Sequence, residues 1–177
     1  RRQRQMCIRD SINAGIWTIR LEPVVTVTGQ YYLYLPAGSG IGESTGFYRA
    51  TPQVTLTIPS TAAKVITVGA YDQVYDTYAD FSGRGYADST RTIGVAAAGL
   101  TKPDLVAPGV NIQAPDVYGS FTPVTGTSFA TPIVSGAAAL LMEWGIVRGN
   151  DPFLYGEKIK AYLRKGARPL RGEREYP

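Results

Sequence analysis

The feature that most constrains the fold is one long apolar stretch, Ser128 to Val147, which is rich in alanine and leucine and follows Gly126. Its length and composition predict a single helix that ends in the turn at residues 148–150. Because this helix is apolar on nearly all sides, we expect it to belong in a core. Its length would also suit a membrane span, but Pro132, Ser135 and Glu143 argue against one. We therefore expect no transmembrane segment.

Other elements are predicted on both sides of this helix. Residues 64–70 (KVITVGA) are almost continuously apolar, which is typical of a strand buried on both faces of a parallel sheet. A second helix is expected over residues 157–165, with Gly166 at its C-terminal cap. Shorter strand-like pieces occupy residues 54–58, 93–98 and 104–107. Together these signals predict an α/β fold with a parallel sheet flanked by helices.

The pattern differs before residue 50. Residues 15–35 alternate apolar and polar side chains, with a break at Gly29 and Gln30, and predict an antiparallel hairpin or pair of strands. Residues 36–46 are dense in glycine and serine, but their spacing fits neither a dinucleotide-binding nor a P-loop motif. We interpret them as a plain loop. Residues 80–85 (DFSGRG) predict a further turn.

The net charge of +4 is concentrated at the N-terminus, where Arg1, Arg2, Arg4 and Arg9 lie. The remainder is nearly neutral, so we expect no nucleic-acid partner. Residues 1–11 (RRQRQMCIRDS) have no structural periodicity and match the translation of a common transposase sequencing adaptor. We interpret this segment as non-native, and with it Cys7, the single cysteine. Disulfides, a thiol nucleophile and a cysteine metal site are then excluded, and the chain is expected to be a fragment of a longer protein.

Ser128 is the residue with the clearest catalytic potential. A serine hydroxyl becomes a good nucleophile only when a base takes its proton and donors stabilise the oxyanion that forms. Ser128 lies where a glycine-containing turn meets the long helix, so its N–H would be an unpaired donor at the positive end of the helix dipole. Gly126 permits a tight turn, and Thr127 offers a second hydroxyl. The spacing alone leaves an alternative open, in which Ser128 is an ordinary capping serine.

The residues around Ser128 resemble the nucleophile block of the subtilases, the subtilisin-like serine peptidases. Residues 126–132 (GTSFATP) and 136–141 (GAAALL) carry this resemblance. Residues 59–70, 81–85 and 102–110 are similar, in the same order, to the blocks that precede it. Residues 15–35 and 142–165 resemble the large clostridial subtilases that include the spore-germination proteases, whose catalytic domain is interrupted by a jelly-roll insert.

The resemblance implies a domain organisation and an activity. Residues 12–50 would be the end of the jelly-roll-like insert, and residues 51–177 the C-terminal half of the catalytic domain. The whole protein would be a serine endopeptidase that acts on protein or peptide substrates through an acyl-enzyme on Ser128, without a cofactor. Gly126 and Thr127 would support the oxyanion site, while Thr125 and Phe129 would line the leaving-group side of the cleft. A spore-associated, cell-envelope or secreted bacterial protein is implied.

Two departures from the family pattern stand out. The family usually has methionine and histidine where this chain has Phe129 and Ile133, and Phe129 would narrow the leaving-group side. The chain contains no histidine at all. In the subtilase order the catalytic Asp and His and the oxyanion Asn precede the insert, so we expect them upstream of this chain and expect the chain alone to be inactive. The alternative function is that of a pseudoprotease, a binding or signalling module in germination.

Other polar residues are weaker candidates for catalysis. We interpret Asp72, Asp80 and Asp116 as turn residues and Asp104 as structural, rather than as a triad acid. Nothing in the sequence places a desolvated Lys102 amine beside Ser128, so a Ser-Lys pair is not favoured. No metal site is predicted in this chain, although calcium is possible in the complete proteins of the family.

Overall fold

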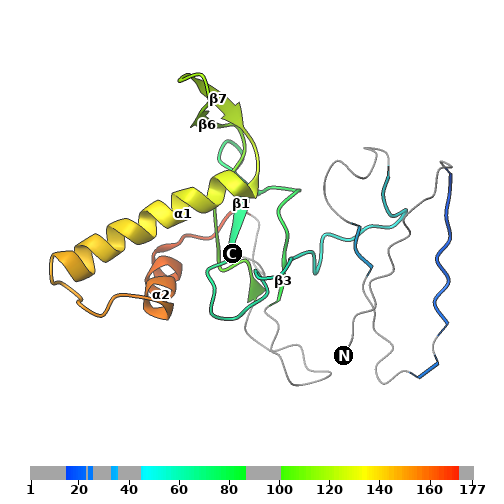
Figure 1. Ribbon diagram of the computed structural model, residues 1–177, viewed down its shortest axis with the longest axis horizontal. Helices are drawn as coiled ribbons and strands as arrows, with labels where there is room; N and C mark the ends of the chain where they lie inside the picture. Colours follow the sequence, from blue (N-terminus) through cyan, green and yellow to red (C-terminus); the bar gives the residue numbers. More distant parts are fainter. Residues whose placement is uncertain (1–14, 23, 26–32, 36–44, 87–100, 172–177) are drawn as a thin grey trace.

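A parallel pair of strands forms the centre of the computed structural model, which describes residues 15–22, 24–25, 33–35, 45–86 and 101–171 (Figure 1). β1 (Val68–Asp72) pairs with β5 (Leu105–Pro108) in the register Val68 to Leu105. On its other edge β1 pairs antiparallel with β2 (Thr77–Tyr78), so the strand order is β2-β1-β5. The predicted α/β class is confirmed, with a parallel pair at its centre.

Both predicted strands of this sheet are found, with shifted bounds. Residues 64–67 were expected in the first strand but precede it, because the N–H of Thr67 is held by the carboxylate of Asp104 at 2.7 Å instead of by a strand partner. The second strand begins one residue later than expected and includes Pro108. Proline is tolerated there because it lies at the end of an edge strand of the described sheet.

Two further pairs of strands extend from this sheet. β3 (Gly85–Tyr86) pairs antiparallel with β4 (Thr101–Lys102). β6 (Ile112–Pro115) and β7 (Phe121–Val124) form an antiparallel hairpin. Figure 1 shows this hairpin projecting from the point where the long helix begins. The hairpin therefore lies beside the start of that helix.

The two predicted helices are confirmed. α1 (Thr127–Met142) begins one residue before Ser128 and continues as a π-helical turn, η1 (Glu143–Val147). α2 (Glu157–Gly166) is amphipathic, with Ile159 buried. The predicted cap at Gly166 is wrong: Gly166 is the last helical residue, and Ala167 ends the helix in an extended conformation.

The core lies between the sheet and α1 and is built mainly from small side chains. Its buried members are Ala70, Ala79, Leu105, Ala107, Ala130 and Val134. Several are alanines, so strand and helix backbones approach closely. Leu163 of α2 packs against the same cluster. This close packing fixes the N-terminal half of α1 on the sheet.

The rest of α1 is not covered as predicted. Only Ala130 and Val134 of α1 are buried, and Leu140 is 68% exposed. The described elements that pack on α1 are β1, β5 and α2, and these cover one side of a helix that is apolar all round. Thr127–Val147 is also the one helix among the described residues long and apolar enough to cross a membrane. The core helix of a globular domain meets the same criterion.

Two strand predictions are wrong in the described residues. Residues 54–58 form no strand, because Val54 has a φ of 57 that breaks the extended conformation and leaves one isolated bridge between Gln53 and Arg84. The described parts of 15–35 form no strand either, and the predicted turn at Gly29 and Gln30 lies outside the described residues. Most of the predicted loop at 36–46, and all of 93–98, lie outside the described residues. The turn at 80–85 is confirmed, with Gly85 opening β3.

Candidate active site

The chain passes from β7 into α1 through Thr125 and Gly126. Gly126 has φ 154 and ψ 158, a backbone region occupied almost only by glycine. Its N–H donates to the carbonyl oxygen of Gly109 at 2.8 Å, and its own carbonyl oxygen accepts from the N–H of Phe129 at 3.1 Å. Gly126 therefore opens the helix and ties its start to the segment that follows β5.

Ser128 is the second residue of α1, and its side chain is exposed. The first N–H groups of a helix have no partner inside the helix and carry the positive end of its dipole. The alternative interpretation of Ser128 as the capping serine is wrong, because the N-cap is Gly126 and no side chain caps the helix. An exposed hydroxyl thus lies directly beside backbone donors suited to an oxyanion.

The four other predicted site residues are the neighbours of Ser128 in the chain, at the end of the hairpin and in the first turn of α1. Thr127 is half-buried, and its carbonyl oxygen accepts a hydrogen bond from the Thr131 hydroxyl at 2.9 Å. A Cβ added to Gly126 would lie 3.6 Å from Cδ2 of Phe129, so that ring lies against the turn. Thr125 is exposed, and its Oγ1 accepts the N–H of Asn111 at 3.0 Å. All five predicted site residues are therefore together, but the Thr125 hydroxyl oxygen is already engaged.

The three aspartates predicted to be turn residues, Asp72, Asp80 and Asp116, lie in or directly beside turns. Asp72 accepts hydrogen bonds from backbone N–H groups two and three residues further on. Asp80 is exposed in a turn. At the tip of the β6–β7 hairpin, hydrogen bonds from the Ser120 hydroxyl and from the N–H groups of Tyr118 and Ser120 lower the pKa of Asp116. These contacts support the turn interpretation of the three carboxylates.

The fourth aspartate, Asp104, is buried between two lysines. Its Oδ2 lies 2.6 Å from Nζ of Lys102, and its Oδ1 lies 2.8 Å from Nζ of Lys160. Lys102 is fully buried and also donates to the carbonyl oxygen of Val65 and the hydroxyl of Thr67. Burial lowers the pKa of Lys102, while the hydrogen bond to Asp104 opposes that shift.

This lysine cluster is separate from Ser128. Lys102 and Asp104 precede β5, whereas Gly109, which contacts the Ser128 turn, follows it. At about 3.3 Å per residue, a four-residue strand separates the two ends by more than 10 Å. A Ser-Lys pair between Ser128 and Lys102 is therefore not formed.

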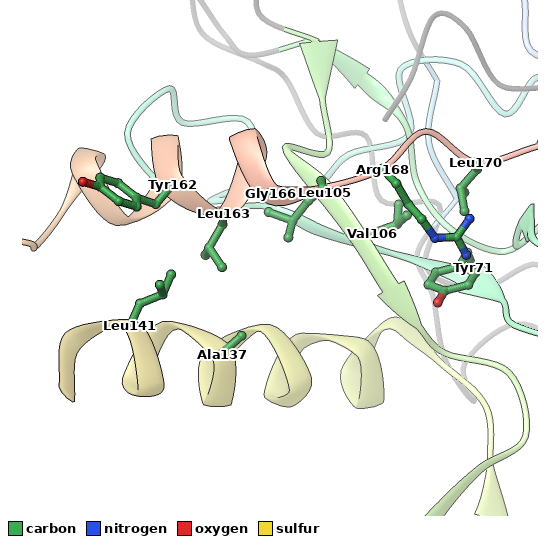
Figure 2. A pocket seen from close by; sticks show the side chains of 11 residues that line it. Tyr71, Leu105, Val106, Ala137, Leu141, Tyr162, Leu163, Gly166, Arg168 and Leu170 are labelled. Carbon is green, nitrogen blue, oxygen red and sulfur yellow. The ribbon is translucent and has the colours of Figure 1, made fainter. Parts of the chain in front are cut away.

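A groove of about 430 Å³ lies between the two helices and the sheet (Figure 2). Leu141 and Ala137 of α1 face Leu163 of α2 across it, and Tyr71 and Arg168 lie together at its other end. Ala137 follows Ser128 by nine residues, which is about 13 Å along a helix. The groove is therefore not part of the Ser128 site.

Two residues that hold the site were missed by sequence reasoning. Gly109 is buried, and its carbonyl oxygen holds Gly126. Asn111 has a φ of 52, a left-handed conformation that asparagine tolerates better than most residues, and its N–H holds Thr125. A Pro-Gly pair followed closely by asparagine, directly after a strand, is the signal that indicates such a bend.

Within the part of the chain that the structure describes, no three His, Cys, Asp or Glu side chains are grouped as a metal site would require.

Comparison with known proteins identifies relatives of this chain. The model of the subtilase family matches residues 39–175. Serine protease AprX of Bacillus subtilis is 34% identical over 132 residues, which cover 63% of this chain and 26% of AprX. Subtilase-type proteinase RRT12 of Saccharomyces cerevisiae is 38% identical over 104 residues, which cover 58% of this chain and 17% of RRT12.

A solved structure, the CspB protease of Clostridium perfringens, superimposes on this chain with a TM-score of 0.67 at 47% identity. The match covers 77% of this chain and 28% of CspB. The chain thus spans about a quarter of the length of AprX and of CspB.

Proposed function

We propose, from the premise that this chain belongs to the subtilase family, that the complete protein is a serine endopeptidase and that Ser128 is its nucleophile. The single observation that carries the proposal is the position of Ser128: exposed, second in α1, and directly after the Gly126 turn. A serine peptidase needs its hydroxyl and its oxyanion donors at one point, and this position provides both.

The reaction follows from that position. With its proton taken by a histidine base, the Ser128 hydroxyl oxygen would attack the scissile carbonyl carbon, and the N–H of Ser128 would stabilise the oxyanion of the tetrahedral intermediate. The intermediate would collapse to an acyl-enzyme as the protonated amine leaves, and water would then hydrolyse the ester. Gly126 would let the substrate backbone approach, Thr127 would support the oxyanion, and Phe129 would bound the leaving-group side.

The base is supplied from outside this chain, which contains no histidine. We place the catalytic Asp and His and the oxyanion Asn in the upstream part of the protein. Two observations support this: the chain spans about a quarter of AprX and CspB, and most of α1 is exposed although it is apolar. The upstream part would cover that exposed face and complete the cleft. Polypeptides would be the substrates, and no observation favours the pseudoprotease alternative.

The domain organisation belongs to the same proposal. Residues 12–50 would be the end of a jelly-roll-like insert and residues 51–177 the C-terminal half of the catalytic domain, as in the clostridial subtilases that the sequence resembles. A spore, cell-envelope or secreted location follows from that resemblance alone.

The test is hydrolysis of a peptide substrate by the complete protein and by two variants. Ser128→Ala should lower kcat by at least about 10³-fold, as loss of a serine nucleophile does. Ser135→Ala is the matched control, because Ser135 is exposed on the same helix and its hydroxyl donates only to the carbonyl oxygen of Thr131. A Ser128→Ala variant with wild-type kcat would refute the assignment.

A further inference from the structure

Two hydrogen bonds close the base of the β6–β7 hairpin directly before α1. The strand register ends at the pair Ile112 and Val124. Beyond that pair, the N–H of Asn111 donates to Oγ1 of Thr125 at 3.0 Å, and the N–H of Gly126 donates to the carbonyl oxygen of Gly109 at 2.8 Å. The Thr125 side chain thus holds the two arms of the hairpin together beyond the last pair of the strand ladder.

One side of this closure is fixed to the sheet. The N–H of Gly109 donates to the carbonyl oxygen of Tyr71 in β1 at 3.1 Å. A Cβ on Gly109 would lie 2.5 Å from Cβ of Ala70, a fully buried core residue, so Gly109 is packed directly on β1. The segment from Gly109 to Asn111 is therefore anchored on β1 through Gly109, and it is the support to which Thr125 and Gly126 are bonded.

We infer that Thr125 is a positioning residue for Ser128, acting through its hydroxyl oxygen. Only Gly126 and Thr127 separate the two residues, and Gly126 lacks a side chain to limit its backbone. Two bonds to the support, at Thr125 and at Gly126, fix both the place and the orientation of the peptide unit that leads into α1. A single hydrogen bond would leave this peptide unit free to rotate about that bond. This inference rests on the proposed nucleophile and changes the role of Thr125 from lining the cleft to holding the turn.

The kinetic consequence is a change in rate rather than in binding. A catalytic group displaced by about 1 Å loses as much as about 10²-fold in rate. Removing one of two supporting bonds loosens the turn without removing the nucleophile or its donors. We therefore expect a loss of about tenfold in acylation, with KM nearly unchanged, when the Thr125 acceptor is removed.

The experiment measures acylation by a fluorophosphonate, together with kcat and KM for a peptide, in the complete protein. Thr125→Val keeps the β-branched shape but removes the acceptor, and should acylate about tenfold more slowly. Thr125→Ala should give the same loss, which guards against a variant that fails to fold for reasons of shape. Thr125→Ser keeps the hydroxyl and should restore the wild-type rate.

The matched control lies at the opposite end of the same hairpin. Asp116→Ala removes the carboxylate that accepts from Tyr118 and Ser120, and so loosens the tip but not the base. It should lower the thermal midpoint of unfolding without slowing acylation. Wild-type acylation in Thr125→Val and Thr125→Ala, a slow Thr125→Ser, or an equally slow Asp116→Ala would each overturn the inference.

Failure of the proposed function gives a different result. If the wild-type protein is not labelled, or if labelling survives Ser128→Ala, the nucleophile assignment itself is wrong. If labelling depends on Ser128 but not on the Thr125 hydroxyl, only the positioning role is wrong.

Discussion

Replacing Gly109 with alanine, which adds a single methyl group, should disturb both the fold and the Ser128 site. In Gly109→Ala the new Cβ would lie 2.5 Å from Cβ of Ala70 and 3.2 Å from the carbonyl oxygen of Gly126. Its φ lies outside the left-handed region, so the effect is steric and not one of backbone preference. Ala70 is fully buried on the central strand, so its methyl group has no room to move.

The size of the effect follows from these distances. Carbon atoms pack at about 3.5–4.0 Å, so β5 and β1 would have to separate by about 1 Å or more at this point. Overpacking of a core costs about 1–3 kcal/mol. The displaced Gly109 would also weaken its hydrogen bond to Gly126, which contributes about 1 kcal/mol. We expect a total loss of about 2–4 kcal/mol in the free energy of unfolding.

The assay is urea denaturation of the 177-residue chain, followed by circular dichroism. Gly136→Ala is the matched control, because Gly136 lies in the interior of α1 and a Cβ there would meet no atom within 4 Å. It should stabilise the chain by about 0.5–1 kcal/mol, since alanine is the better helix former. The reasoning is refuted if Gly109→Ala costs less than about 1 kcal/mol, or if Gly136→Ala is equally damaging.

Three further predictions concern the buried charges and the isolated chain. Asp104→Ala should cost about 3–5 kcal/mol in unfolding experiments, because it leaves two buried ammonium groups without their carboxylate. Loss of the Asp76–Arg168 pair through its exposed partner, in Arg168→Ala, should cost little, and this cost should vanish in about 1 M salt. Burial lowers the pKa of Lys102 below its ordinary 10.5. Between the folded and the unfolded pKa, this amine binds fewer protons in the folded chain than in the unfolded chain, so the free energy of unfolding should rise with pH in that range. Lys102→Met should flatten this rise when denaturation is measured as a function of pH. The isolated 177-residue chain should not be labelled stoichiometrically by a fluorophosphonate, and rapid labelling abolished by Ser128→Ala would contradict this.

Local signals in the sequence predicted the helices well. The alanine- and leucine-rich run after Gly126 placed the start of α1 to within one residue, because helix propensity and a glycine start signal act over neighbouring residues. Its predicted end at Val147 is instead the end of the π-helical turn η1, which follows α1. The same local signal could not show whether Ser128 caps the helix or lies inside its first turn. The structure separates them, because Gly126 occupies the N-cap position and Ser128 lies inside the first turn.

Contacts between distant residues account for most of what the sequence did not predict. The first strand begins late because Thr67 is bound by Asp104, 37 residues away. The base of the hairpin depends on Asn111 and Thr125, 14 residues apart. Such pairings depend on the packed sheet and leave no periodic pattern in the chain. The exposure of α1 has a different cause. The elements that pack on it in the described part of the chain cover only one side of a helix that is apolar all round.

The most direct test of the central claim is to locate the covalent adduct. The complete protein should be inactivated by a fluorophosphonate, and mass spectrometry of its peptides should place a single modification on Ser128, within the sequence GTSFATP. An adduct on any other serine, or an unmodified Ser128 in a protein that hydrolyses peptides, would contradict the account.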